Sequence, residues 1–222
     1  QRAKKRPLQY ILGEWPFLDF HLKMGEGVLI AREDTTVLVE TAAKLIQAKQ
    51  AAILDLCAGT GAVGLGIASL LSTVNVTCVE KYAPAFAYLQ QNIALCKKQG
   101  IENVAALQGD ILSEAFASAF QDIDAIVSNP PYIETAVLPT LQDEVQKEPT
   151  TALDGGEDGL LFYRAIADIW IPKMKTGGIV AVEIGEGQET DVARIFSNVG
   201  IEQIQFEKDS GNIIRVVAGI KK

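Results

Sequence analysis

Short apolar runs alternate with longer segments of helical spacing over most of the chain. Strand-like runs occur at residues 51–56, 74–80, 104–108, 125–128 and 179–184. Helical segments separate or follow them, at residues 62–72, 83–98, 113–119, 158–174 and 188–199. Because apolar strands that alternate with helices are typical of parallel sheets covered on both faces, this pattern predicts an α/β fold.

The carboxyl-terminal part of the chain departs from this alternation. Residues 201–208 and 213–220 are both strand-like, and the turn-type sequence Asp209-Ser210-Gly211-Asn212 joins them. Two strands with such a connection form an antiparallel hairpin. The predicted fold is therefore Rossmann-like, with a mostly parallel seven-stranded sheet ending in an antiparallel hairpin. That layout is typical of class I S-adenosylmethionine-dependent methyltransferases.

The first fifty residues precede this core. Residues 1–14 are polar and basic and predict a linker, while residues 15–31 predict a short hairpin whose turn is Gly25-Glu26-Gly27. Apolar residues at helical spacing within 34–49 predict a helix. We therefore divide the chain into a linker at 1–14, a hairpin and helix at 15–50, and a core domain at 51–222.

Composition excludes several classes of protein. Of the 222 residues, 48% are hydrophobic and 22% are charged, as in a globular domain with a sizeable core. The longest apolar stretch, residues 62–71, is ten residues long, whereas a membrane span needs about twenty. Three cysteines without CxxC spacing predict neither a disulfide framework nor a metal site. With His21 as the only histidine, Ser-His-Asp and Cys-His catalysis are disfavoured.

The charge distribution argues against nucleic acid as the main partner. The formal net charge is −8, from 20 Lys and Arg against 28 Asp and Glu. Four of the basic residues (Arg2, Lys4, Lys5 and Arg6) lie within the first six positions, so 16 basic residues face 28 acidic ones and the body carries −12. An acidic body repels a phosphate backbone. We interpret the basic cluster as part of a solvated linker.

A glycine-rich loop follows the first core strand. Gly59, Gly61 and Gly64 satisfy the pattern G-x-G-x-x-G, Asp55 precedes them, and Glu80 lies 21 residues after Gly59. Glycines let the backbone approach a nucleotide, and an acid at the tip of the second strand binds the ribose hydroxyls. The loop therefore predicts a nucleotide-type cofactor. By itself it fits NAD and S-adenosylmethionine equally well.

The third strand also ends in an acidic residue. Asp110 follows the strand directly, and Ile111 is next in the chain. Parallel strands place their carboxyl ends at one edge of the sheet, where ligands bind in open α/β folds. We expect Asp110 to accept a hydrogen bond from an adenine amine and Ile111 to cover the face of the ring.

The sequence Asn129-Pro130-Pro131-Tyr132 closes the fourth strand and favours a methyl-transfer function. The two prolines fix φ and carry no amide hydrogen, so the Asn129 side chain and nearby carbonyls remain as acceptors. A planar NH2 group attacks poorly because its lone pair is delocalised. If Asn129 and the Pro130 carbonyl accept its two hydrogens, its nitrogen is held ready for an electrophilic methyl group. Tyr132 can stack on the planar group and exclude water.

With these motifs the chain resembles the catalytic domain of the HemK/PrmC family of protein-(glutamine-N5) methyltransferases, which modify peptide-chain release factors. The resemblance extends to four further segments, namely Arg6 to Glu14 (RPLQYILGE), Arg32 to Thr35 (REDT), Glu148 to Arg164 (EPTTALDGGEDGLLFYR) and Glu183 to Gly185 (EIG). The family usually carries a small helical amino-terminal domain, so residues 1–14 would be the linker from that missing domain.

The resemblance implies which residues form the site. Those expected around S-adenosylmethionine are Asp55, Cys57, Ala58, Gly59, Thr60, Gly61, Glu80, Asp110, Ile111 and Asn129, and those expected to hold the substrate glutamine are Asn129, Pro130, Pro131 and Tyr132. Cys57-Ala58 stands where the family usually has Gly-Thr, and Ala31 replaces a usual proline. Because Ala58 lacks a hydroxyl, we expect one cofactor hydrogen bond fewer. Glu183 and Glu186 are interpreted as solvated or capping carboxylates.

The expected function is methylation of the glutamine in the Gly-Gly-Gln motif of release factors by a cytoplasmic monomer, without a metal, nucleic acid or membrane. The alternative is an N6-adenine DNA or RNA methyltransferase, or a ribosomal-protein glutamine methyltransferase, with the same acceptor motif. An NAD-dependent oxidoreductase would leave residues 129–132 and the terminal hairpin unexplained. A catalytically inactive binding module would predict a broken acceptor motif, and this motif is intact.

Overall fold

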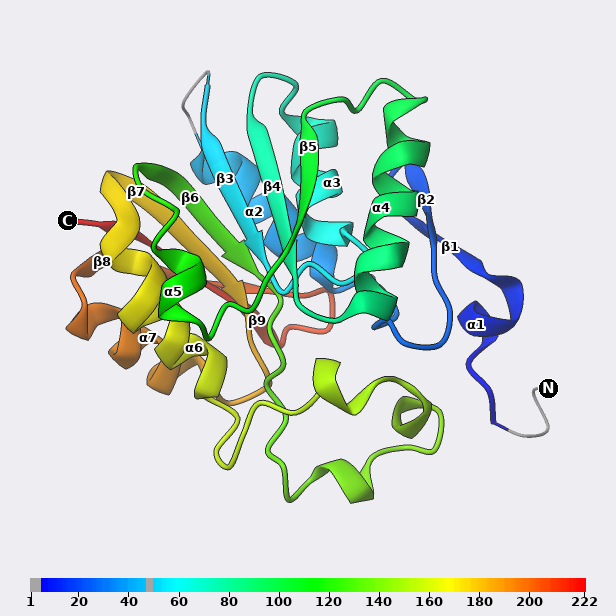
Figure 1. Cartoon of the computed structure of the whole chain (residues 1–222). Helices are drawn as coiled ribbons and strands as arrows, with labels where there is room; N and C mark the ends of the chain where they lie inside the picture. Colours follow the sequence, from blue (N-terminus) through cyan, green and yellow to red (C-terminus); the bar gives the residue numbers. More distant parts are fainter. Residues whose placement is uncertain (1–4, 47–49) are drawn as a thin grey trace.

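A seven-stranded sheet forms the centre of the computed structural model, which describes residues 5–46 and 50–222. The strand order is β5-β4-β3-β6-β7-β9-β8 (Figure 1). The strands are β3 (Ala52–Leu56), β4 (Asn75–Glu80), β5 (Val104–Gln108), β6 (Ile123–Ser128), β7 (Met174–Glu183), β8 (Ile201–Lys208) and β9 (Ile214–Lys221). The two pairings made by β9, with β7 and with β8, are antiparallel and the other four pairings of this sheet are parallel, which confirms the predicted fold class.

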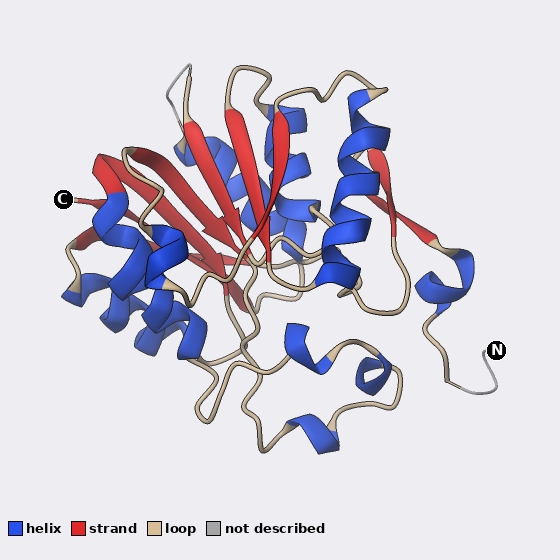
Figure 2. Ribbon diagram, viewed as in Figure 1, coloured by secondary structure: helices blue, strands red, loops and turns tan. Residues whose placement is uncertain are grey.

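Helices cover both faces of the sheet (Figure 2). One face carries α2 (Thr35–Leu45), α3 (Ala62–Leu70) and α4 (Ala83–Lys97), and the other carries α5 (Glu114–Ala117), α6 (Leu161–Ala165) and α7 (Glu189–Asn198). Successive strand residues point to opposite faces. In β3, Ile53 therefore packs in one core, and Leu54 and Leu56 pack in the other. Burial on both faces explains why these strands are continuous apolar runs.

The amino-terminal hairpin is present, but the predicted position of its turn is wrong. Strands β1 (Glu14–Phe17) and β2 (Phe20–Lys23) are joined by Leu18 and Asp19. Gly25 and Gly27 instead let the chain pass close to α4, because a β-carbon on Gly25 would lie 2.3 Å from the hydroxyl oxygen of Tyr88. Gly27 has φ of +96°, which favours glycine.

Part of the segment predicted as a linker is structured. Helix α1 (Leu8–Leu12) buries Tyr10, whose hydroxyl donates to the carbonyl oxygen of Val28. Lys5 forms an ion pair with Asp143. The predictions for Arg2 and Lys4 lie outside the described residues, as does the end of the predicted helix at 34–49.

The long helix predicted at 158–174 is interrupted. Helix α6 is followed by a π-helical turn, η5 (Ile166–Trp170), and a 3₁₀ turn, η6 (Ile171–Lys173). The indole nitrogen of Trp170 donates to the carbonyl oxygen of Ile111 at 2.8 Å, which connects this turn to the end of β5. Pro172, which has no amide hydrogen, lies in the last turn.

Residues 133–160 lie beyond the carboxyl ends of the strands (Figure 1). They contain three 3₁₀ turns, η2 (Leu138–Thr140), η3 (Val145–Lys147) and η4 (Thr150–Ala152). Glu148 attaches this segment to the amino-terminal part of the chain. Its carboxylate is buried, accepts from the amide of Ile30 at 2.9 Å, and forms an ion pair with Arg32.

Asn92 of α4 connects the hairpin to the core domain. Its side-chain oxygen accepts from the amide of Lys23 at 2.7 Å, and its nitrogen donates to the carbonyls of Lys23 at 3.0 Å and Thr60 at 2.9 Å. The side chain is fully buried. Because Thr60 belongs to the glycine-rich loop, one amide group holds both the hairpin and that loop against α4.

We expect Asn92→Ala to lower the free energy of unfolding by about 2–3 kcal/mol, because buried backbone groups lose their partners. Urea denaturation measures this change. The matched control is Asn198→Ala, at an exposed position on α7, which should stay within about 0.5 kcal/mol of the parent. Equal denaturation midpoints for the two variants would show that the buried hydrogen bonds contribute nothing.

Candidate active site

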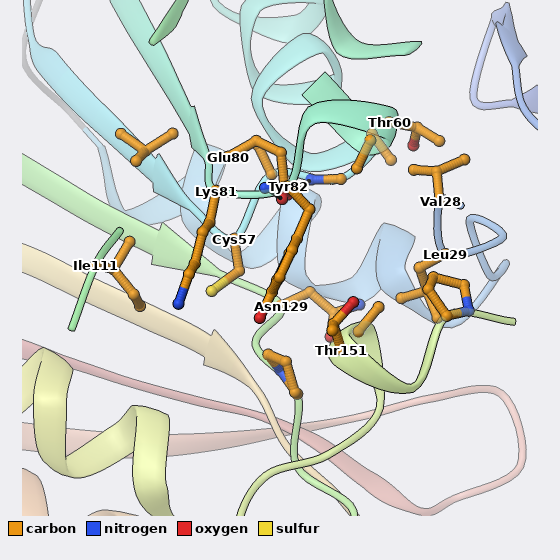
Figure 3. Close-up of a pocket in the computed structure, with 18 of the residues that line it drawn as sticks. Val28, Leu29, Cys57, Thr60, Glu80, Lys81, Tyr82, Ile111, Asn129 and Thr151 are labelled. Carbon is orange, nitrogen blue, oxygen red and sulfur yellow. Dashed lines mark hydrogen bonds between the residues drawn. The ribbon is translucent and has the colours of Figure 1, made fainter. Parts of the chain in front are cut away.

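A pocket lies where the strand order reverses between β3 and β6. It encloses about 970 Å³, including space open to solvent, and residues that follow β3, β4, β5 and β6 line it. Ligands of open α/β sheets bind at the carboxyl ends of the strands at such a reversal. The labelled side chains in Figure 3 come from these elements and from two further segments, which contain Val28 with Leu29 and Thr151, and they surround one space. The topology therefore brings residues far apart in sequence to one site.

Nine of the thirteen predicted site residues line this pocket. They are Cys57, Ala58, Gly59, Thr60, Glu80, Asp110, Ile111, Asn129 and Pro131. The other four, Asp55, Gly61, Pro130 and Tyr132, are not part of its lining.

Asp55 lies behind the glycine-rich loop. Its side chain is fully buried, and its Oδ2 accepts from the amide of Gly64 at 2.9 Å. Burial raises the pKa of Asp55 to about 7, although the Gly64 amide and Cys78 act against that shift. A β-carbon on Gly64 would lie 2.4 Å from the Cys78 sulfur. Asp55 thus fixes the start of α3.

The Glu80 carboxylate connects two loops at the pocket. Its Oε2 accepts from the amide of Gly59 at 2.9 Å, and its Oε1 accepts from the amide of Tyr82 at 2.8 Å. Burial raises the pKa of Glu80, and the backbone amides of Tyr82 and Gly59 oppose this rise. The backbone amides hold the carboxylate in one orientation. Each oxygen has a further lone pair for a donor in the pocket.

Asp110 has a partner that sequence reasoning missed. Lys81 also lines the pocket, and its Nζ lies 2.8 Å from Asp110 Oδ2. Asp110 Oδ1 accepts from the amide of Leu112 at 3.0 Å. Burial would raise the pKa of Asp110, but these two hydrogen bonds outweigh it and the pKa is lowered. Asp110 therefore stays an acceptor. The sequence carries no signal for the ion pair, because Lys81 and Asp110 follow different strands.

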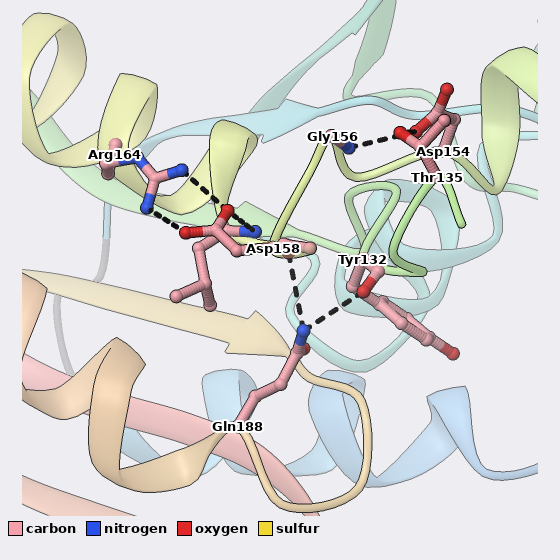
Figure 4. Close-up of polar contacts among 9 residues, drawn as sticks. Tyr132, Thr135, Asp154, Gly156, Asp158, Arg164 and Gln188 are labelled. Carbon is pink, nitrogen blue, oxygen red and sulfur yellow. Dashed lines mark hydrogen bonds and ion pairs between the residues drawn. The ribbon is translucent and has the colours of Figure 1, made fainter. Parts of the chain in front are cut away.

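The acceptor motif is fixed at two points. Asn129 Nδ2 donates to the Thr35 hydroxyl oxygen at 3.2 Å, and the carbonyl oxygen of Tyr132 accepts from Gln188 Nε2 at 3.0 Å. Figure 4 shows the Gln188 side chain pointing toward Tyr132. The same Gln188 nitrogen lies 3.4 Å from the carbonyl oxygen of Gly159. Burial raises the pKa of Tyr132 to about 12, so its hydroxyl stays protonated.

Glu183 was interpreted as a solvated or capping carboxylate, and the solvated interpretation is wrong. Its side chain is only 3% exposed at the end of β7, whereas Glu186 is exposed. The Thr35 and Asn129 side chains lie beside the carboxylate, and hydrogen bonding to them lowers its pKa. The sequence Glu183-Ile184-Gly185 by itself gave no reason to expect Glu183 beside Asn129. The pairing of β6 with β7 makes them neighbours.

Two pocket walls were also not predicted. Residues 27–31 form one, and Pro149, Thr151 and Ala152 contribute to another. Both walls belong to segments without strands or long helices of their own. The Glu148 contacts with Ile30 and Arg32 hold them together. These contacts join residues that lie more than 100 positions apart in the sequence, so they can be found only in the folded structure.

Within residues 5–46 and 50–222, no cluster of three or more His, Cys, Asp or Glu side chains is placed to hold a metal ion. In the same ranges, no helix has both the length and the apolar character needed to cross a membrane.

Solved structures with a similar fold are methyltransferases. A methyltransferase from Pyrococcus furiosus is 17% identical, with a TM-score of 0.63, and the match covers 90% of this chain and 88% of that one. A precorrin-6y C5,15-methyltransferase from Geobacter metallireducens is 12% identical, with a TM-score of 0.60 and coverage of 90% and 94%. The sheet order and these likenesses define a class I methyltransferase fold.

The family follows from sequence comparison. A family model described as "Conserved hypothetical protein 95" matches residues 34–162. The release factor glutamine methyltransferase of Clostridium acetobutylicum is 37% identical, covering 99% of this chain and 77% of that protein. The protein of the same name from Geobacter sulfurreducens is 40% identical, with coverage of 99% and 75%. The chain belongs to the release factor glutamine methyltransferase family.

Cys57 has φ of +63°, in the left-handed region that favours glycine. This conformation costs a side chain about 1–2 kcal/mol. We expect Cys57→Gly to have a free energy of unfolding about 1 kcal/mol higher than Cys57→Ala, since both lose the thiol and only alanine keeps a β-carbon.

Chemical denaturation of the two variants tests this order. The same two substitutions at Cys78, which is buried within β4 at negative φ, provide the control. There glycine should be the less stable variant, because it adds backbone freedom without relieving strain. An alanine variant at position 57 as stable as the glycine variant would contradict the strain argument.

Proposed function

We propose that this enzyme binds S-adenosylmethionine in the pocket and methylates the side-chain nitrogen of the glutamine in the Gly-Gly-Gln motif of peptide-chain release factors. The observation that carries the proposal is the orientation of Asn129. Its nitrogen donates to Thr35, so its oxygen is the atom left to accept hydrogen bonds at the pocket. Membership of the family supports the choice of substrate.

The residues present fit the cofactor. Glu80 is a fixed, buried acceptor for ribose hydroxyls, and Asp110 is an acceptor for an adenine amine, beside the apolar Ile111. The loop at residues 57–60 presents backbone groups without long side chains. When bound, S-adenosylmethionine supplies an electrophilic methyl group. The alanine at position 58 offers no hydroxyl, so the loop contributes through its backbone.

The acceptor motif fits a planar amide. A glutamine NH2 has two hydrogens, and the Asn129 oxygen and the Pro130 carbonyl are suited to accept them. Holding both hydrogens orients the nitrogen toward the pocket and favours a pyramidal geometry, in which its lone pair is available. As the new nitrogen–carbon bond forms, the bond between the methyl carbon and the sulfur of the donor would break and leave its electron pair on the sulfur. The nitrogen would then release one proton to solvent. Gln188 keeps the backbone of Tyr132 in place beside this slot.

A release-factor loop fits the slot better than a folded surface does. Glycine residues next to the glutamine let the substrate backbone approach closely. The acidic body, with −12 outside its first six residues, disfavours a phosphate backbone. The proposal places the enzyme in the cytoplasm, where release factors act, as a monomer.

We expect Glu80→Ala to weaken S-adenosylmethionine binding by about 1–3 kcal/mol, because a charge-assisted hydrogen bond is lost. Isothermal titration calorimetry measures the affinity. The control is Glu102→Ala, an exposed carboxylate between α4 and β5, which should leave the affinity unchanged. Unchanged affinity in Glu80→Ala, or tight NAD binding by the parent, would refute the cofactor assignment.

The substrate is tested by incubating the enzyme with cofactor and either a release factor or adenine-containing DNA. Mass spectrometry should show a gain of one CH2 group confined to the Gly-Gly-Gln peptide. Methylation of adenine with none on the protein would favour the nucleic-acid alternative.

In Asn129→Ala we expect kcat to fall by roughly 10²-fold or more, because an acceptor of the reacting amide is removed. A folded Asn129→Ala enzyme with parental kcat would refute the acceptor role.

A further inference from the structure

We propose that Glu183, acting through Thr35, is a positioning residue that sets the orientation of the Asn129 amide for methyl transfer; this inference rests on the proposed function. The three side chains come from different elements. Asn129 directly follows β6, Glu183 ends β7, and Thr35 begins α2. Because Ser128 pairs with Val182 in parallel register, the next residues of the two strands are neighbours at the sheet edge.

The hydrogen bonds among these residues have a direction. Asn129 Nδ2 donates to Thr35 Oγ1 at 3.2 Å, and both side chains lie close enough to the Glu183 carboxylate to lower its pKa by hydrogen bonding. A carboxylate only accepts, and a threonine hydroxyl carries one hydrogen. With that hydrogen given to Glu183, Thr35 has only lone pairs to offer Asn129. The negative charge of Glu183 therefore requires that the Asn129 nitrogen faces Thr35 and Glu183 and that the Asn129 oxygen faces the pocket.

The orientation matters because the two ends of an asparagine amide are nearly equal in shape. If the amide turned over, its NH2 would face the NH2 of the substrate glutamine, and two donors would oppose each other. Both Thr35 and Glu183 are only 3% exposed, so water offers little alternative hydrogen bonding. Glu183 thus distinguishes two orientations that packing alone does not.

Glu183 is also an incompletely satisfied buried carboxylate. Within the described residues, its Oε2 is buried and has no hydrogen-bond partner. Burial raises its pKa to about 7, against the hydrogen bonds of Thr35 and Asn129 and the charge of Arg215 on β9. Asp34 lies before α2 and raises the pKa further.

Two tyrosine hydroxyls also belong to the surroundings of Glu183. Tyr163 of α6 donates to the backbone carbonyl of Glu183 at 2.9 Å, and the Glu183 charge raises the pKa of Tyr132. Both hydroxyls stay neutral near pH 7, since burial raises their pKa values. Glu183 is therefore the group that changes charge here near neutral pH. Its protonation would add a donor and remove the bias on Asn129, so kcat should fall as the pH drops through about 7.

The test compares the parent with Glu183→Gln, in the full chain, by measuring kcat and KM between about pH 6 and 9. The glutamine amide of the substrate has no ionisation in this range. We expect Glu183→Gln to lose the acidic limb of the kcat profile and to reduce kcat by about tenfold at high pH, with KM changed less than twofold. Glu186→Gln, the same change at an exposed position three residues on, should keep the parental profile.

Asp55, whose pKa is also raised to about 7, remains in every variant. If Glu183→Gln keeps both the acidic limb of the kcat profile and the parental kcat, the titrating group is not Glu183, and the proposal is overturned. Thr35→Val should lower kcat by about tenfold, and Thr35→Ser, which keeps the hydroxyl, should restore it. A Thr35→Val enzyme with parental kcat would also overturn the proposal.

A second measurement needs no substrate. In ¹⁵N-labelled protein, the Asn129 side-chain amide signals should shift with pH around a midpoint near 7, and this shift should vanish in Glu183→Gln. The same midpoint in both proteins would refute the positioning role, whatever the substrate is. If the parent shows the shift but methylates no release factor, the proposed function fails and the inference about Glu183 stands.

Discussion

The buried hydrogen bond between Asp55 and the amide of Gly64 is the constraint on which the site depends. It joins the end of β3 to the first turn of α3 and brings the intervening loop to the pocket. Gly64 has no room for a side chain, because Cys78 lies against it. With the loop fixed, the amide of Gly59 reaches Glu80 at the end of β4. One carboxylate behind the loop thereby determines where the second carboxylate, in front of it, is held.

The places of the core strands in the sequence were predictable, because strands that are buried on both faces of a sheet are continuous apolar runs. The residues that follow β3, β4, β5 and β6 then had to meet at one edge, and the glycine-rich loop, Glu80, Asp110 and Asn129 do so. The hairpin turn was predicted wrongly. Residues 25–28 do form a turn, in which the amide nitrogen of Val28 lies 3.4 Å from the carbonyl oxygen of Gly25, but this turn follows β2 and packs against α4 instead of joining β1 to β2. Nothing local in the sequence distinguishes these two places for a turn.

The partners of the polar site residues were not predictable. Lys81 with Asp110, Asn92 with Lys23 and Thr60, and Glu183 with Asn129 are pairs whose members lie in different elements. Each pairing depends on sheet order and register, which a single sequence does not give. For the same reason the sequence led to Glu183 being interpreted as a solvated or capping carboxylate, whereas its side chain is buried.

The contact between Glu148 and residues 30–32 has a consequence for the timing of the catalytic cycle. It joins the two walls that enclose the pocket away from the sheet. A spent ligand that leaves between these walls has to separate a buried carboxylate from the Ile30 amide and the Arg32 guanidinium. Product release by that path then proceeds no faster than this contact opens, so the rate of turnover and the rate of methyl transfer would depend on different contacts around one pocket.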